Sequence, residues 1–384
     1  MKKVTKNRIF GCFLFLVFLL LLSFPISAEN QTAVPLPEEY TEAVDQLPQE
    51  LLDRLPEGLQ EGEAESPEEA LTKMSGADYL LSVTAELLGV SFSSAWRLLA
   101  SMCALLILCS ILREIGETAG SGTLSSVLHF CSTGCLFLLL SGTLIEQLSE
   151  LKLYFDRLNG MMSTMIPVTG TVWAMGGNVS TASAGTATLY SFLAVSEALC
   201  AKSLLPMVGI STSLVLCNLT FPELGMGQFL SAIRKIYTVG IGFLMTLLVA
   251  SLATQTAIGT AADGTGAKAA KFLSSTVIPV VGGSVGDTLR TVASGVEYVK
   301  SVVGISGILF VLLLFLPTLV QLLISRLCFL LGSGAADLLG CSKESRLLSE
   351  MGTVYGTMLG VTSMTAIMFI LSFVIFMQTT IAIS

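Results

Sequence analysis

Two oppositely charged side chains stand where two apolar stretches of the chain meet. Glu197 and Lys202 fall at the junction of residues 189–201 and 204–219. Ionisable groups within apolar stretches of membrane proteins often mark substrate or ion pathways. On a regular α-helix a separation of five residues places side chains about 140° apart, so this pair forms only where the helix bends. An equally good interpretation places both residues at the ends of two half-helices, beside water.

A second group of candidate residues interrupts an apolar stretch near residue 280. Broken backbone at membrane depth must be buried in protein or line a water-filled cavity, because each unsatisfied backbone group costs several kcal/mol in hydrocarbon. Glycines spaced four residues apart also permit close packing of helices. We therefore expect these residues to line a conduit or to pack against other helices. They are Pro279, Gly282, Gly283, Gly286, Asp287 and Arg290.

No pattern typical of enzymatic chemistry accompanies these groups. His129 is the single histidine, so it cannot supply an H-E-x-x-H motif, and neither a phosphate-binding loop nor a G-x-S-x-G elbow occurs. None of the nine cysteines forms a C-x-x-C pair. We expect them to serve as small buried hydrophobes, including Cys131 and Cys135, which share a helix face. The sequence therefore predicts no enzyme, no metal and no cofactor.

The elements that position the candidate residues follow from composition. The 384 residues are 53% apolar and only 12% charged, whereas a soluble domain is about a quarter charged. This balance predicts a polytopic membrane protein of the all-α class. No basic stripe with interleaved aromatic residues occurs, so we expect no nucleic-acid partner. We expect the lipid bilayer to surround the protein.

Apolar windows predict six to eight membrane-spanning helices. The windows cover residues 93–112, 124–146, 161–177, 186–201, 203–219, 237–258, 303–325 and 354–378. Several have the roughly 20 residues that a bilayer requires, whereas those at 161–177 and 186–201 are short enough for half-helices or tilted pieces. The basic residues that best mark the cytoplasmic side are Arg113, Arg234, Lys235, Arg326, Lys343 and Arg346.

The chain divides into three expected parts. Residues 1–28 read as a signal peptide, with an uncleaved anchor as the alternative. Residues 29–90 form an acidic extracytoplasmic segment, with 15 acidic and two basic side chains between Glu29 and Glu86. This segment contains either short amphipathic helices or a solvated linker. Residues 91–384 form the multi-span membrane domain.

The region around residue 280 is expected to combine two elements. Residues 272–286 are too short and too broken for a full crossing, which favours a re-entrant or broken segment. Residues 284–303 carry an apolar seam at spacings of three and four, which predicts an interfacial amphipathic helix. On its polar side, Glu297 and Lys300 can pair at i,i+3. The alternative is a kinked span followed by an amphipathic loop. The seam consists of Val285, Leu289, Val292, Val296, Val299 and Val303.

The order of these features resembles one known family. A signal peptide, an acidic extracytoplasmic region and a multi-span body are followed by a distinctive pattern between Thr265 and Arg326. Its motifs are Ala-Lys-Phe at 270–272, Ile-Pro-Val-Val-Gly at 278–282, Asp-Thr at 287–288 and Val-Gly-Ile at 303–305. Together they resemble the stage III sporulation protein AE family.

The resemblance implies a subunit role at a double membrane. Family members are non-enzymatic membrane subunits that assemble with other stage III sporulation membrane subunits in the mother-cell membrane around the forespore. This secretion-like, channel-like complex joins a forespore membrane partner and is required for forespore development. A related ATPase subunit would supply energy, consistent with the missing phosphate loop.

Gly356 and Gly360 favour helix packing within the chain, with a homo-oligomer as the alternative.

Two other classes of function compete with this interpretation. A stand-alone secondary transporter of a small polar solute would use Glu197, Lys202, Asp287 and Arg290 as contacts. Transporters often show paired broken helices in two related halves, whereas this sequence has one strong broken segment and no convincing internal repeat. That difference favours the subunit. The third class is a passive membrane anchor whose acidic segment recruits partners.

Overall fold

The computed structural model describes residues 77–118, 122–220, 226–277 and 282–381, and this part of the chain is helical without strands. Its elements are α6 (Ala77–Thr118), α7 (Gly122–Met175), α8 (Val179–Val195), the π-helical turn η1 (Ser196–Ala201), α9 (Lys202–Thr220), α10 (Met226–Val277), α11 (Gly282–Leu338) and α12 (Ser342–Gln378). Elements α8, η1 and α9 follow one another without a break. The chain thus has six helices that are long and apolar enough to cross a membrane, which confirms the expected all-α class and the lower end of the expected six to eight spans.

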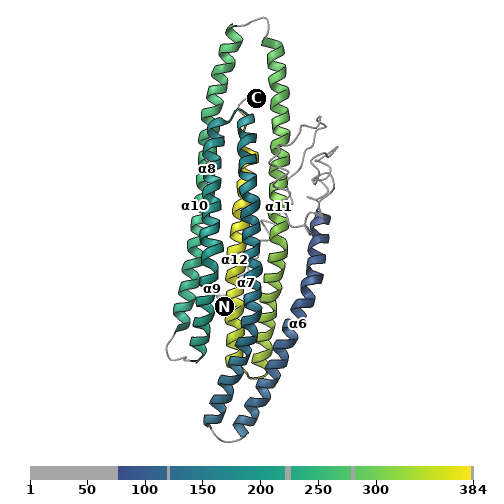
Figure 1. Cartoon of the computed structure of the whole chain (residues 1–384), viewed down its shortest axis with the longest axis vertical. Coiled ribbons are helices and arrows are strands. Elements are labelled where there is room, and N and C mark those ends of the chain that lie inside the picture. The colour runs from purple at the N-terminus through teal and green to yellow at the C-terminus, as the bar shows by residue number, and fades with distance from the viewer. Residues whose placement is uncertain (1–76, 119–121, 221–225, 278–281, 382–384) are drawn as a thin grey trace.

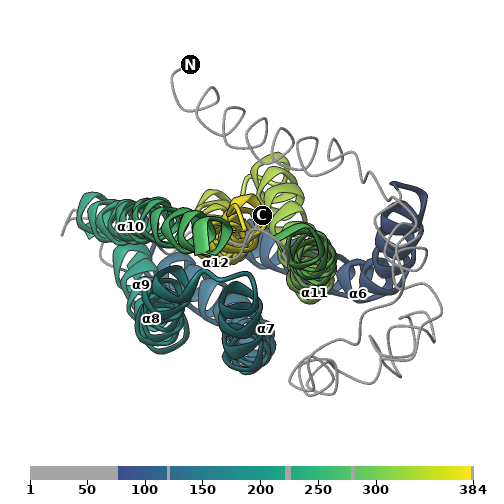
Figure 2. The same ribbon diagram turned by 90° about the horizontal axis from the view of Figure 1, so that it is seen from above.

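The helices form an elongated antiparallel bundle (Figure 1). Figure 2 shows α12 inside the bundle, between α10 and α11, and α6 at its edge. Helix α12 also packs on α7 and α9, while α6 packs on α7 and α11. Two of the tight turns depend on glycine, because Gly177 and Gly340 have φ values of 79° and 72° that other residues rarely adopt.

The core is built from large apolar side chains that approach small ones. Trp173 is fully buried and packs edge-on against Phe376, with ring centroids 5.2 Å apart. Gly185 of α8 faces the same indole, and a Cβ at this position would stand 2.7 Å from Cη2 of Trp173. Because glycine has no side chain, α8 packs directly on α7 at this point.

Two pairs of expected spans merge into single elements. Residues 124–146 and 161–177 both belong largely to α7, and residues 186–201 and 203–219 both lie in the run from α8 to α9. The sequence separates the first pair by a charged stretch, residues 147–160. Charged side chains interrupt an apolar window without interrupting the helical backbone, so hydropathy alone divides one helix into two.

Two described helices end on either side of the break that the sequence predicts near residue 280, and residues 278–281 lie outside the described residues. Helix α10 ends at Val277 and α11 begins at Gly282, while Pro279 lies outside the described residues. Residues 272–277 continue α10, and residues 282–303 begin α11, so the two long helices share this region. Figure 1 shows these helices as the arms of a hairpin that extends past the end of α12.

The apolar seam of residues 284–303 is buried over part of its length. Val296, Val299 and Val303 are buried, as the spacing predicts. Lys300 was expected on the polar side next to Glu297, and this expectation is wrong. Its side chain is buried and donates a hydrogen bond to the carbonyl of Thr379. The reason is tertiary, because the residues that follow α12 lie against this side of α11.

Candidate functional site

A carboxylate of α10 joins that helix to the start of α8. Asp263 accepts hydrogen bonds from the backbone N–H groups of Ser180 and Thr181 at 3.1 and 3.0 Å, and from Oγ1 of Thr181 at 2.9 Å. These N–H groups belong to the first turn of α8, which has no intrahelical acceptors for them. The negative charge also complements the positive end of the helix dipole.

The residues after α12 are held at the same end. Nε1 of Trp173 donates to Oγ1 of Thr379 at 3.0 Å, and Nδ2 of Asn178 donates to the carbonyl of Thr380 at 2.7 Å. Lys300 donates to the carbonyl of Thr379. The α7–α8 turn, α11 and the chain after α12 are thus tied together by polar contacts that include a buried ammonium group.

Further down the bundle, polar side chains again meet across helices. Nη1 of Arg234 in α10 lies 2.8 Å from Oε2 of Glu350 in α12, and the arginine side chain is only 7% exposed. Gln321 of α11 donates to Glu150 of α7, and Gln147 donates to the same carboxylate at 3.2 Å. Polar groups from four helices therefore pair in the lower half of the bundle, the Gln321–Glu150 contact lying nearer the upper end than the Arg234–Glu350 contact.

These contacts define an upper polar level and a staggered lower polar level, because Gln321 and Glu350 differ in height by about ten residues. An apolar layer separates the two levels. The upper polar level contains Asn178, Asp263, Lys300 and Gln378. The lower polar level contains Glu150, Arg157, Glu197, Lys202, Arg234, Gln321, Arg326 and Glu350. The stretches between them hold no charged residue and comprise residues 158–177, 179–196, 236–262, 301–320 and 351–377. Each has roughly 18–27 residues, which fits a hydrocarbon core about 30 Å thick.

A π-helical turn brings the first pair of candidate residues together. Nζ of Lys202 lies 2.7 Å from Oε1 of Glu197, and the two side chains are 71% and 53% exposed. The backbone N–H of Lys202 bonds to the carbonyl of Glu197, five residues earlier. Because this wider turn brings residues five apart onto the same face, the helix departs from regular geometry as the pairing requires.

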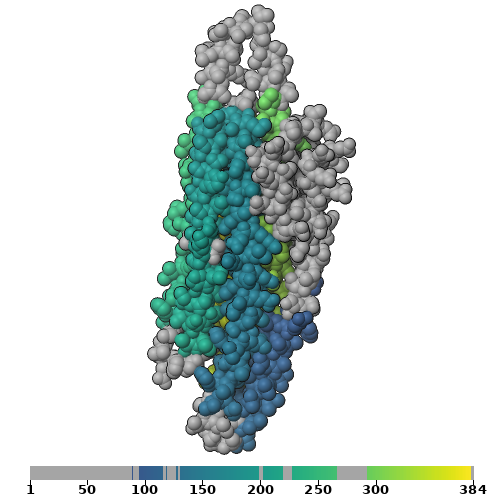
Figure 3. Space-filling view, in the orientation of Figure 1, coloured from purple at the N-terminus to yellow at the C-terminus, as the bar shows by residue number. Residues whose placement is uncertain are grey.

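The pair lies at the edge of the apolar layer. Ile166 of α7 and Leu189 of α8 line the same small pocket, which fixes the register of this antiparallel hairpin. Arg157 comes nine residues before Ile166, and residue 198 comes nine residues after Leu189. Because the two helices are antiparallel, these positions lie at the same height. Figure 3 shows α7, α8 and α9 side by side on this face.

The second group of candidate residues lies at the other end. Gly282, Gly283 and Gly286 belong to the first turns of α11, as do Asp287 and Arg290, whereas Pro279 lies outside the described residues. The side chains of this part of α11 also lie outside the described part. The start of α11 and the π-turn are separated by the apolar layer, so the two groups do not form one site.

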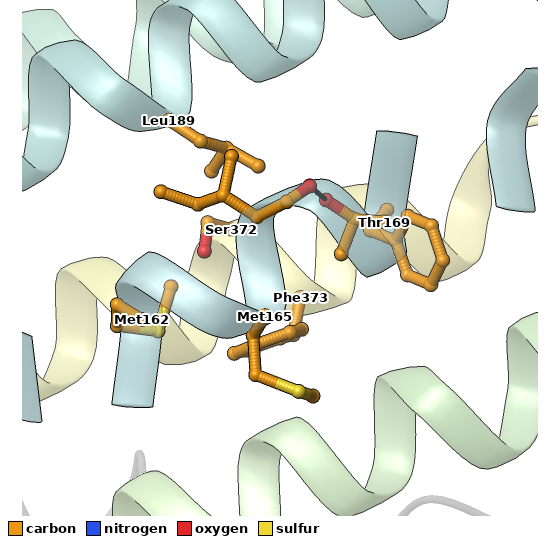
Figure 4. Close-up of a pocket in the computed structure, with 8 residues that line it drawn as sticks. Met162, Met165, Thr169, Leu189, Ser372 and Phe373 are labelled. Atoms are coloured by element: carbon orange, nitrogen blue, oxygen red, sulfur yellow. Dashed lines mark hydrogen bonds between the residues drawn. The ribbon is translucent and has the colours of Figure 1, made fainter. Parts of the chain in front are cut away.

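Figure 4 shows a pocket between α7, α8 and α12. Its lining is apolar apart from Thr169 and Ser372, and it has no room for a water molecule. Thr169 donates to the carbonyl of Ile166 at 2.8 Å, and Ser372 donates to that of Phe369 at 2.6 Å. Both hydroxyl groups are therefore satisfied within their own helices, and the pocket offers no binding group for a polar solute.

The cysteines are distributed differently from the expectation. Cys131, Cys135 and Cys217 are exposed on the bundle, so the expected burial of these three is wrong. A weakly polar thiol is tolerated on the outside of a bundle with an apolar surface. Cys341, in the turn before α12, is buried, and this burial raises the pKa of its thiol, with a further contribution from Glu344. Among the described residues, no group of histidine, cysteine and acidic side chains is placed to hold a metal.

Sequence reasoning missed the residues that pair across helices. Asp263, Lys300 and Glu350 each stand at the end of an uncharged stretch, and this spacing is a signal that could have found the two polar levels. Their partners could not be found in this way, because Ser180, Thr379 and Arg234 are distant in the chain.

Comparisons with known proteins agree with these features. The family model described as stage III sporulation protein AE matches residues 73–380. A protein of Bacillus subtilis (strain 168) named stage III sporulation protein AE is 22% identical over 212 residues, which cover 55% of this chain and 53% of that protein. The chain thus spans about half the length of this relative, and no solved structure matches it. Since the family model covers most of a chain whose helices could cross a membrane six times, the chain belongs to the stage III sporulation protein AE family.

Proposed function

We propose that this protein is a non-enzymatic membrane subunit of a sporulation complex that links the mother cell and the forespore. It lies in the mother-cell membrane around the forespore and assembles with other stage III sporulation membrane subunits and a forespore membrane partner. The complex acts as a secretion-like channel that forespore development requires. Residues 29–90 face the space between the two membranes. Family membership supports the sporulation role.

The observation that carries the subunit role is an exposed apolar surface on the α6–α7 hairpin. Helix α6 lies beside the lower part of α11, where Ala95 meets Cys328 and Ser110 meets Leu339. The apolar window of α6, Ala95–Ile115, lies there and is one of the six that could cross a membrane. Exposed apolar patches that lipid does not cover are typical of protein interfaces. Large exposed side chains of the α6–α7 hairpin are Ile107, Ile111, Phe130 and Leu138, which are 52–70% exposed.

Helix length supports the same proposal. At about 1.5 Å per residue, the 52 residues of α10 and the 57 residues of α11 extend about 78 and 86 Å. A hydrocarbon core is only about 30 Å thick. The α10–α11 hairpin therefore projects beyond the upper polar level, while the α6–α7 hairpin projects beyond the lower one. A scaffold that reaches out of the membrane on both sides suits a complex between two membranes.

A passage through the complex would lie between subunits. The pocket of Figure 4 is closed and apolar, so it provides no path for a polar solute. The candidate residues 279–290 lie at the projecting end of the α10–α11 hairpin, where they would dock a partner or border the passage. Glu197 and Lys202 would present charge at the edge of the apolar layer, toward a partner or the passage.

Purification from sporulating cells tests the proposed complex. Full-length protein extracted in mild detergent is expected to bring other stage III membrane subunits with it. Reconstitution of the purified protein alone into liposomes is expected to give no solute uptake. Recovery of the protein by itself, together with solute transport in liposomes, would favour the secondary transporter instead.

Variants of exposed side chains test whether the α6–α7 hairpin forms an interface. Phe130→Ser and Leu138→Ser change exposed side chains of the α6–α7 hairpin, so we expect unchanged thermal stability and reduced recovery of partner subunits. Val179→Ser is the matched control, because Val179 is 67% exposed at the opposite end of the bundle. Equal partner recovery for all three variants would contradict an interface on this hairpin.

Two further experiments test the tip of the α10–α11 hairpin and the passive-anchor alternative. Replacing Asp287 by Asn and Arg290 by Gln should lower partner recovery if the tip of the α10–α11 hairpin docks a partner, and Glu297→Gln on the exposed side of α11 serves as control. Deleting residues 29–76 leaves α6 whole. Loss of every partner after this deletion, with a stable membrane body, would indicate a passive anchor.

A further inference from the structure

The side chain of Arg326 in α11 packs against Gly356 in α12. If Gly356 carried a Cβ, that atom would stand 3.1 Å from Cζ and 3.3 Å from Nε of Arg326. The Arg326 side chain is half-buried, and no described residue forms a hydrogen bond or ion pair with it. Arginine stays charged in proteins, so its guanidinium requires an anion or water. At the lower polar level, this charge lies at the edge of the apolar layer.

Acids near this site already have other partners. Glu350 is the acid on the adjoining part of α12, and its carboxylate is already bonded to Arg234 at 2.8 Å. Nε and Nη2 of Arg234 are buried without a partner among the described residues. Glu150 of α7 is bonded to Gln321, so neither of these two carboxylates forms an ion pair with Arg326.

A stripe of α12 leads from Arg326 into the apolar layer. We define the outer stripe of α12 by residues spaced three or four apart, which fall on one helix face between α10 and α11 (Figure 2). Leu371 is 39% exposed, and Met364 and Ile367 are half-buried. Gly360 is buried, yet no atom lies within 4 Å of where its Cβ would stand, so the stripe contains a hollow. The outer stripe of α12 consists of Thr353, Gly356, Gly360, Met364, Ile367 and Leu371.

This arrangement matches the chemistry of an amphiphile. A guanidinium binds phosphate through parallel hydrogen bonds, and it stands here at the height of lipid headgroups. The hollow and the aliphatic side chains above it lie at the depth of acyl chains. A partner helix would have to supply its own acid at the membrane surface, whereas phospholipid already carries the anion. We propose that Arg326 and the outer stripe of α12 bind one anionic phospholipid, with its phosphate on Arg326 and an acyl chain along Gly360, Met364 and Leu371.

This inference is independent of the proposed function, because it concerns the purified chain and lipid alone. Thermal unfolding of the full-length protein in detergent is measured with added phosphatidylglycerol, with phosphatidylcholine and with inorganic phosphate. We expect phosphatidylglycerol to stabilise the protein more than the other two. Hydrogen bonds to a charged group contribute about 1.5–3 kcal/mol, so Arg326→Gln should weaken phosphatidylglycerol binding about tenfold or more.

Two matched pairs of variants make the test specific. Arg157→Gln is the control for charge, because Arg157 is exposed at the lower polar level on α7 and should leave lipid binding unchanged. Gly360→Leu places a side chain in the hollow, where its Cβ meets no atom within 4 Å, and should reduce lipid binding while the fold persists. Gly209→Leu on α9 is its control, since nothing lies within 4 Å of that Cβ position either.

Four results would overturn the proposal. Equal stabilisation by phosphatidylglycerol and phosphatidylcholine would exclude an anion-selective site, and full stabilisation by inorganic phosphate would indicate a free-anion site without a lipid chain. Lipid binding that survives Gly360→Leu would remove the acyl chain from the stripe, whether or not Arg326→Gln folds. Unchanged lipid binding with loss of a co-purifying protein would assign the stripe to a partner helix.

Discussion

At the scale of single residues, charges at the ends of the apolar layer also bind helices to one another. Asp263 shows this directly, because its carboxylate accepts three hydrogen bonds at the start of α8 although it belongs to α10. The acid thus acts as an N-cap supplied by a neighbouring helix. Such a residue positions the α7–α8 hairpin without touching a substrate.

Replacing Asp263 by Ala should lower the free energy of unfolding by roughly 1–2 kcal/mol, since helix caps typically contribute this amount. Asp263→Asn should have a smaller effect, because the amide oxygen still accepts hydrogen bonds but carries no charge. Thermal unfolding in detergent measures both changes. Asp156→Ala, on the exposed side of α7, is the control, and an equal loss in both proteins would contradict the capping role.

The ion pair of the π-turn should behave differently from the cap. Both side chains are more than half exposed, and exposed pairs contribute about 0–1 kcal/mol to stability. We therefore expect Glu197→Gln and Lys202→Gln to leave the melting temperature nearly unchanged while reducing assembly or activity in sporulating cells. Normal sporulation by both variants would remove these residues from the candidate site.

At the scale of elements, α7 and α8 depend on close packing between an indole and a glycine. Trp173 is held by its hydrogen bond to Thr379 and by its contact with Phe376, so its ring has little freedom to move. The α7–α8 hairpin is therefore sensitive to any side chain added at Gly185. The same substitution at an open position of a helix has no such neighbour.

Gly185→Ala should destabilise the protein by about 1–3 kcal/mol, because the new methyl group overlaps the buried ring of Trp173. Gly209→Ala should be neutral or stabilising by up to about 1 kcal/mol, since alanine favours the helix and no atom lies within 4 Å of its Cβ. Thermal unfolding of the two variants should thus give opposite signs. Equal melting temperatures would refute the packing argument.

Sequence patterns identified the helices better than their ends. The apolar windows on either side of residues 147–160 are genuine, but the backbone continues through the charged stretch because charge does not break a helix. The π-turn at Ser196–Ala201 is the opposite case, because here the backbone geometry changes within an apolar stretch. The sequence indicates that Glu197 and Lys202 pair only where the helix departs from regular geometry, whereas the wider turn itself is visible only in the structure.

At the scale of the whole molecule, we propose that a bilayer surrounds the bundle between the two polar levels. The five uncharged stretches between them come from helices that are otherwise much longer than a bilayer requires. Parts of α6, α7, α10 and α11 must then lie outside hydrocarbon. This supports the proposed role in a larger assembly.

Cysteine labelling along α10 checks this depth. After the nine native cysteines are replaced, single cysteines at exposed positions Lys235, Leu247 and Ala262 are treated with a water-soluble thiol reagent in membranes opened to both sides. Lys235→Cys and Ala262→Cys should react, because they adjoin the lower and upper polar levels. Leu247→Cys should stay unlabelled within the layer. Equal labelling of all three would place the bilayer elsewhere.

The sequence by itself determined the class of the protein, because apolar content, low charge and stretches of about 20 uncharged residues are local properties that a bilayer requires. It also located the break between α10 and α11, since proline and glycine act on their own backbone. Only the tertiary structure decided which charges meet. Lys300 is buried against Thr379, Arg234 pairs with Glu350, and Arg326 lies on Gly356, because contacts between helices depend on how distant segments pack together.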